Sequence, residues 1–169
     1  MEKKYKLTEE SIKLRDRKLY RIEAIRDFGR VSKGQKGGFV ETESNLSQVG
    51  DAWVYDDAKV FGNAKVYGDA KVFGNAEVCG DAKVYGNAKV YDDAKVCGDA
   101  DYIVFKNWWS SGRYFTWTRS NNKWMVGCFY GTGEELIKKA YDDSEKKGRE
   151  YERVVKYVES MLTGEKEDQ

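Results

Sequence analysis

Arginine and aromatic side chains alternate in the stretch RYFTWTR, residues 113–119. Alternate side chains of a β-strand point to the same face, so two arginines and two aromatic rings are expected to share one face. Two tryptophans precede this stretch, and a turn at residues 120–122 leads to a lysine and a further tryptophan. The candidate partner-binding residues of this hairpin are Trp108, Trp109, Arg113, Phe115, Trp117, Arg119, Lys123 and Trp124.

Three interpretations of this hairpin remain open. The first is that Phe115 and Trp117 pack beneath helices as ordinary core residues. The second is a protein interface, because arginine and tryptophan are typical of binding hot spots. The third is a grip on single-stranded nucleic acid, in which charge holds the backbone and aromatic rings stack on the bases.

Histidine, the usual general base near neutral pH, is absent from the 169 residues. None of the cysteines forms a CxxC pair, so a zinc site is not expected. The glycines follow a structural repeat and form no phosphate-binding loop. We therefore predict no catalytic residues, no metal and no cofactor.

A six-residue repeat dominates the middle of the chain. Alanine stands at every sixth position from Ala52 to Ala100, and valine at every sixth position from Val54 to Val96. Between them come Gly or Asp and then Asn or Asp, which suit tight turns. A period of six fits neither a heptad nor a simple alternating strand, but it is typical of a β-helix built from short stacked strands. Three units make an 18-residue coil, which predicts a mainly β fold with a three-sided parallel β-helix of about three coils.

Residues 18 apart should stack vertically at about 4.8 Å. Lys59, Glu77 and Lys95 then form one column, in which the acidic residue separates two lysines. The residue after each valine should point outwards. The resulting aromatic columns are candidate partner- or self-binding surfaces, namely Tyr55, Phe73 and Tyr91 in one column and Tyr67 and Tyr85 in another.

The cysteines fall into two environments. Cys79 and Cys97 are vertical neighbours in the predicted stack, within reach of a disulfide. We expect two free thiols, because an odd number of cysteines without a secretory signal suggests a reducing compartment. Cys128 is expected in the core.

Both ends of the repeat carry non-repetitive sequence. Residues 1–49 are predicted to form an N-terminal cap with a strand within 17–29, and residues 50–103 the β-helix. Residues 104–169 are predicted to form an α+β domain with a small sheet and two helices. Thr132 and Glu135 have the spacing of a capping box at the start of the first helix, and Gly148 is expected to separate the two helices.

Charge, hydropathy and the N-terminal sequence favour a location in the cytoplasm. The 30 basic residues nearly balance the 29 acidic ones, which does not favour nucleic acid or a membrane surface as the partner. No apolar run approaches the roughly 18 residues that a membrane helix needs, and the N-terminal sequence lacks a signal-peptide core.

The repeat units, such as VFGNAK and VYGDAK, resemble the hexapeptide repeat of left-handed β-helix proteins. Residues 36–64 are also similar to the N-terminal entry of an uncharacterised, transferase-like subgroup of that family. The stretch WMVGCFYGT, residues 124–132, resembles a tail domain of repeat proteins from phages and gut bacteria. The resemblance implies a left-handed coil, and acyltransferases of the family rely on a histidine that this chain lacks.

These observations favour a non-enzymatic protein-interaction module in the cytoplasm of a bacterial cell. The phage-like tail suggests an inhibitor that binds and blocks a bacterial defence complex, in the manner of anti-CRISPR proteins, and the aromatic columns suggest contacts between copies of the chain. One alternative is a divergent acyl- or nucleotidyl-transferase that lacks the usual histidine. The other alternative is a single-stranded nucleic-acid binder that uses the hairpin.

Overall fold

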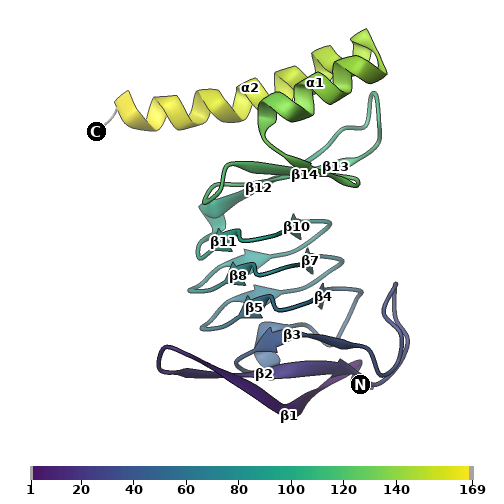
Figure 1. Ribbon diagram of the computed structural model, residues 1–169, viewed down its shortest axis with the longest axis vertical. Helices are drawn as coiled ribbons and strands as arrows, with labels where there is room; N and C mark the ends of the chain where they lie inside the picture. The colour runs from purple at the N-terminus through teal and green to yellow at the C-terminus, as the bar shows by residue number, and fades with distance from the viewer. Residues whose placement is uncertain (1, 168–169) are drawn as a thin grey trace.

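A computed structural model describes residues 2–167 and contains the predicted β-helix (Figure 1). Strands that are 18 residues apart pair in parallel, so Lys59 aligns with Glu77 and Glu77 with Lys95. Three walls result, with the orders β3-β5-β8-β11, β4-β7-β10 and β6-β9. The strands of the coils are β4 (Trp53–Val54), β5 (Lys59–Val60), β6 (Lys65–Val66), β7 (Lys71–Val72), β8 (Glu77–Val78), β9 (Lys83–Val84), β10 (Lys89–Val90) and β11 (Lys95–Val96). The prediction of a three-sided solenoid is confirmed.

The repeat explains the coil geometry. Every valine of the repeat from Val54 to Val96 is buried, as is every repeat alanine from Ala52 to Ala94. Turns close with a hydrogen bond such as the one from the Ala58 N–H to the Tyr55 carbonyl at 3.1 Å. The residue after Tyr55, Asp56, has a φ of 52°, a left-handed conformation that most other repeats give to glycine. At Gly80 a side chain would also collide with the next coil, since a Cβ would lie 2.5 Å from the Cys97 carbonyl.

Vertical stacking also brings two cysteines of neighbouring coils together. The Cα atoms of Cys79 and Cys97 are 4.4 Å apart, and the two sulfurs form a disulfide. The expectation of two free thiols was therefore wrong. The expectation for Cys128 was wrong as well, because this free cysteine is exposed in the turn that follows β14.

The N-terminal cap is an antiparallel sheet that merges with the solenoid. It consists of β1 (Tyr5–Leu14), β2 (Arg17–Ala24) and β3 (Lys36–Val40), and β3 continues as the first strand of one parallel wall. The strand predicted within residues 17–29 is β2, whereas β1 was not predicted, because most of its residues are polar and partly exposed. The buried rings of Tyr5, Phe28 and Trp53 pack edge to face under the first coil.

Side-chain donors complete the hydrogen bonds of the first coil. In the repeat, each coil donates backbone N–H groups to carbonyls of the next coil, so the first coil has carbonyls with no coil below them. The buried Asn45, which ends a short 3-10 helix (η1, Glu43–Asn45), donates from Nδ2 to the carbonyls of Gly62 and Ala64 at 3.0 and 2.9 Å. The Lys4 ammonium donates to the carbonyls of Gly50 and Ala52 at 3.0 and 2.8 Å.

At the other end, a four-stranded antiparallel sheet separates the solenoid from two helices (Figure 1). Its strands are β12 (Tyr102–Lys106), β13 (Tyr114–Thr118), β14 (Lys123–Val126) and β15 (Phe129–Gly131), preceded by a short 3-10 helix, η2 (Asp99–Asp101). The predicted turn at residues 120–122 joins β13 to β14, and the capping box is present, with the Glu135 N–H donating to Thr132 Oγ1 at 3.2 Å. An α+β domain at the C-terminal end is confirmed.

The two helices, α1 (Gly133–Asp143) and α2 (Glu145–Glu167), are separated at Ser144. The prediction that Gly148 separates them was wrong. Gly148 lies inside α2 and is buried against the ring of Tyr141 on α1. A Cβ at this position would collide with that ring, so α1 and α2 can approach this closely only with glycine here. Among the described residues, no helix is both long and apolar enough to cross a membrane.

Candidate interaction surfaces

The most exposed aromatic side chain of the C-terminal domain is Trp108, at 77% exposure. It lies in the loop between β12 and β13 beside Trp109, and the two rings meet edge to face with centroids 5.6 Å apart. Tyr157 of α2 is 56% exposed and contacts Phe105 of β12 edge to face. We call this surface the tryptophan patch, and it comprises Phe105, Trp108, Trp109, Val154 and Tyr157, with Glu150 and Arg153 at its edge.

The loop that carries the two tryptophans is held at both ends. The buried Asn107 side chain accepts hydrogen bonds from the N–H and the hydroxyl of Ser110, both at 3.0 Å, and the Asn107 N–H donates to the Arg113 carbonyl. The Trp109 indole donates to the Glu150 carboxylate of α2 at 2.6 Å. Glu150 also forms an ion pair with Arg153 at 3.0 Å. Hydrogen bonds to Asn107 and Glu150 therefore fix the loop that carries the tryptophan patch.

The other aromatic residues of the predicted hairpin surface lie in the core. Phe115, Trp117 and Trp124 are at most 2% exposed and pack under the helices, where Phe115 meets Tyr151 of α2 with centroids 4.6 Å apart. These three residues are therefore core residues and not partner-binding residues. On the opposite face of β13, Thr116 and Thr118 are buried too, and Thr116 faces the last coil of the solenoid.

The cationic residues of the hairpin are separated from one another. Arg119 is exposed beyond the end of β13, and Lys123 opens β14. Arg113 precedes β13 and lies over Gly127, at the end of a groove that runs along the solenoid. The hairpin thus contributes Trp108, Trp109 and Arg113 to two different surfaces.

The two aromatic columns of the solenoid form as predicted. Tyr55 and Phe73 stack with centroids 4.5 Å apart, and Tyr91 continues the column to Tyr130 of the C-terminal domain. Tyr67 and Tyr85 stack at 5.2 Å, and Tyr85 is 51% exposed. Because stacked rings cover each other's faces, the columns present mainly ring edges to solvent.

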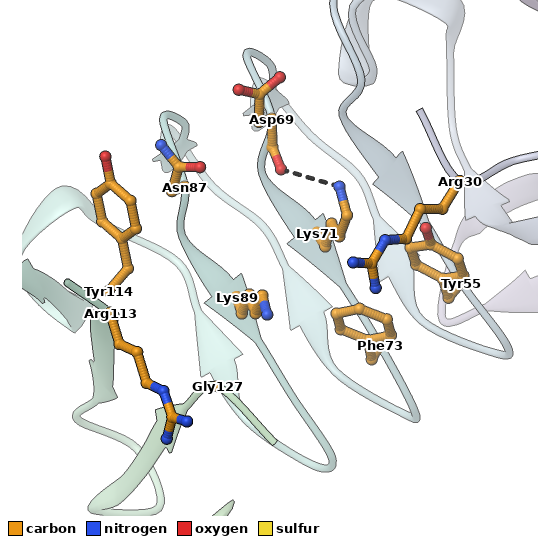
Figure 2. Close-up of a pocket in the computed structure, with 10 residues that line it drawn as sticks. All are labelled: Arg30, Tyr55, Asp69, Lys71, Phe73, Asn87, Lys89, Arg113, Tyr114 and Gly127. Carbon is orange, nitrogen blue, oxygen red and sulfur yellow. Dashed lines mark hydrogen bonds between the residues drawn. The ribbon is translucent and has the colours of Figure 1, made fainter. Parts of the chain in front are cut away.

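An open groove runs along the β4–β7–β10 wall between the N-terminal cap and the C-terminal sheet (Figure 2). We call it the basic groove. It has a volume of about 570 Å³, and its lining residues include Arg30, Tyr55, Lys71, Phe73, Lys89 and Arg113.

The charges of the basic groove are unbalanced. Four cationic side chains line it, with Asp69 as its one anionic lining residue, which gives a formal net charge of 4 − 1 = +3. Lys71 donates to the backbone carbonyl of Asp69 at 3.3 Å and aligns with Lys89 on the next strand. Burial lowers the pKa of the Lys71 ammonium, and the nearby carboxylates of Asp51 and Asp69 offset part of that effect.

Sequence reasoning missed the basic groove. The 18-residue register would have paired Lys71 with Lys89, just as it paired Lys59 with Glu77. Arg30 had no such indicator, because it reaches the groove from an irregular loop after β2.

No group of three or more His, Cys, Asp or Glu side chains that could hold a metal ion occurs within the described part of the chain. Comparison with known proteins places the chain in no group. No family model matches the sequence, and a search of curated proteins found no match.

Proposed function

We propose that this protein is a rigid, non-enzymatic interaction module that docks a partner protein through the tryptophan patch. The observation that carries the proposal is the 77% exposure of Trp108 beside two further exposed aromatic rings. Large aromatic side chains left at a surface usually mark an interaction site, and tryptophan is the residue most enriched in hot spots. The patch has a polar edge formed by Glu150 and Arg153, as protein interfaces do.

The anchoring of the loop supports tight binding. Asn107 already holds the loop and Glu150 holds the Trp109 indole, so less conformational entropy is lost when a partner covers the patch. The sheet beneath the patch rests on the solenoid, so a partner would meet a surface that is fixed to a stiff body.

The absence of histidine supports binding rather than catalysis, since the transferase alternative needs another general base. The narrower form of the proposal is that the module acts in the cytoplasm of a bacterial cell and blocks a defence complex there. It rests on the resemblance of residues 124–132 to a phage-type tail domain.

The test begins with capture of partners by the tagged protein from a nuclease-treated bacterial lysate. The captured protein is then purified, and its binary affinity is measured by calorimetry. We expect the Trp108→Ala, Trp109→Ala double variant to weaken binding by about 30-fold or more, because the loss of even one hot-spot tryptophan costs about 2 kcal/mol or more. The matched control is Tyr85→Ala, which removes another exposed aromatic ring on the solenoid.

Two results would overturn the proposal. One is full affinity in the double variant with loss in Tyr85→Ala, which would assign binding to the Tyr67–Tyr85 column. The other is recovery of only a second copy of this chain, which would make the module a homo-oligomer. In each case, thermal unfolding of the variants checks that the fold is retained.

A further inference from the structure

Four cationic side chains from four separate segments line the basic groove (Figure 2). Arg30 comes from the N-terminal cap, Lys71 and Lys89 from adjacent coils, and Arg113 from the C-terminal domain. Among the residues whose side chains the structure describes, none of the four forms an ion pair with a carboxylate. Like charges placed directly opposite on neighbouring strands repel each other, so the alignment of Lys71 with Lys89 lowers the stability of the fold.

The other two walls do not share this feature. On the β5–β8–β11 wall, Glu77 lies between two lysines and pairs with Lys95 at 4.0 Å. On the β6–β9 wall, Lys65 and Lys83 are in register, but both are exposed to solvent, which screens their repulsion. Lys71 and Lys89 are partly buried and lie between two arginines. Among the lysines of the three walls, Lys71 and Lys89 would therefore be stabilised most by a bound anion.

From this arrangement we infer that the basic groove binds a small ligand with a chain of phosphate groups, of the nucleoside polyphosphate class. Lysine and arginine donate charge-assisted hydrogen bonds to phosphate oxygens, and here two lysines in register on neighbouring strands share the groove with two arginines. The volume of about 570 Å³ falls within the range of small-molecule sites.

The groove also provides contacts for the nucleoside. The ring of Tyr114, which is 36% exposed, lines the groove together with Asn87 (Figure 2). An exposed aromatic ring can stack on a base, and an amide can pair with the donors and acceptors of a base edge. The Asn87 amide is exposed and makes no hydrogen bond with the described residues. We therefore assign the phosphates to the four cations and the base to Tyr114 and Asn87.

This inference goes beyond the proposed function, because the basic groove shares no lining residue with the tryptophan patch. Its test is calorimetry of the purified full chain with ATP in a low-salt buffer. Inorganic tripolyphosphate and adenosine are the comparison ligands, which separate recognition of the phosphates from recognition of the base. We expect ATP to bind, tripolyphosphate to bind more weakly, and adenosine to bind least.

The variants identify the site. The Lys71→Gln, Lys89→Gln pair should weaken ATP binding by about tenfold or more, because it removes two charge-assisted contacts. The matched Lys65→Gln, Lys83→Gln pair removes the same charges from the β6–β9 wall and should change the affinity by less than about twofold. Tyr114→Ala should reduce the preference for ATP over tripolyphosphate. Circular dichroism at increasing temperature checks the fold of each variant.

Three outcomes would overturn the inference. The first is no binding of ATP or tripolyphosphate at millimolar concentration. The second is equal weakening by the two lysine pairs, which would show attraction to the net charge of the protein rather than to a site. The third is a single-stranded oligonucleotide that binds about 100-fold more tightly than ATP and depends on Lys71 and Lys89, which would assign the groove to nucleic acid.

Discussion

The solenoid is covered by hydrogen-bond donors at its N-terminal end and by acceptors at its C-terminal end. The cause is the direction of its backbone hydrogen bonds, in which the Lys59 N–H donates to the Ala76 carbonyl of the next coil. The first coil is thus left with free carbonyls, and the last coil with free N–H groups. Backbone N–H groups of Phe39, Glu41 and Ser47 supply part of the missing donors at the first coil, and side chains from the two caps supply further partners.

The acceptors at the last coil follow the solenoid in the chain, and each receives an N–H group from one of the three walls. The N–H of Lys83 donates to Asp99, that of Lys89 to Thr116 Oγ1, and that of Lys95 to Ser120 Oγ, at 3.0, 3.0 and 2.8 Å. These are short side chains, and the bonds at Lys83 and Lys95 are exposed. The donors at the first coil, Lys4 and Asn45, are fully buried instead. We therefore expect substitutions at the first coil to have larger effects on stability than those at the last.

The largest loss is expected for Asn45→Ala. This change leaves the buried carbonyl of Ala64 and the partly buried carbonyl of Gly62 without this donor, and it also removes the Oδ1 acceptor of the Thr42 N–H. Each buried polar group without a partner costs about 1–3 kcal/mol, so we expect the free energy of unfolding to fall by about 3 kcal/mol. Urea unfolding monitored by circular dichroism measures it.

The control for this prediction is Asn63→Ala. The Asn63 amide donates to the Asp81 carboxylate at the surface, where water can replace it. Its loss should change the free energy of unfolding by less than about 0.5 kcal/mol. Equal effects of the two alanine substitutions would show that side-chain donors do not cap the first coil.

The second prediction concerns the pH dependence that Lys4 imparts. Burial lowers the pKa of its ammonium from 10.5 to about 8, with Arg26 and Lys71 adding to the effect and Asp51 opposing it. Between these two values the folded protein has lost the proton and the unfolded chain still holds it, so stability rises with pH. A neutral amine keeps two N–H donors, so both carbonyl contacts of Lys4 can persist.

We expect the free energy of unfolding to increase by about 2 kcal/mol from pH 7 to pH 10 through Lys4. The increase should be absent in Lys4→Met, which keeps an unbranched apolar stem but has no ionisable group, and urea unfolding across this pH range compares the two proteins. Above pH 10 the sign reverses, because burial raises the pKa of the Tyr5, Tyr102 and Tyr130 phenols and the unfolded chain loses those protons first. An unchanged pH slope in Lys4→Met would assign the effect to another group, such as Lys71.

The third prediction concerns the last coil. Thr116→Val keeps the shape of a buried side chain but removes the acceptor of the Lys89 N–H. We expect the free energy of unfolding to fall by about 1.5 kcal/mol, the cost of one partly buried donor without a partner. Thermal unfolding measures it, and Thr116→Ser, which retains the hydroxyl, should recover most of the loss. If Thr116→Ser is as unstable as Thr116→Val, the methyl group and not the hydroxyl is what matters.

The solenoid could be predicted from its period because each repeat makes the same local choices at the same positions. Its caps could not be predicted in this way. Lys4 and Asn45 lie in segments without periodicity, and their roles depend on where the chain returns under the first coil. The strand β1 was missed for the same reason, since β2 and not its own pattern determines its pairing.

The candidate surfaces, too, depend partly on sequence patterns and partly on tertiary packing. Alternation placed Phe115 and Trp117 on one face of a strand, but only the packing of the helices showed that this face is buried. Trp108 is exposed because it lies in a loop, which has no alternation to follow. The basic groove combines a register that the sequence encodes, Lys71 with Lys89, with two arginines that tertiary structure brings to it.

The smallest effect is expected for Ser120→Ala. The Ser120 hydroxyl accepts from the Lys95 N–H at 2.8 Å, but this bond lies at the surface, so water can take the place of the hydroxyl. We expect a change of less than about 0.5 kcal/mol in the free energy of unfolding. Hydrogen exchange at the Lys95 amide should nevertheless become faster, because its protection depends on that acceptor. A loss as large as that of Thr116→Val would mean that capping of the last coil matters equally at exposed and buried positions, and that burial does not explain the difference between the two ends.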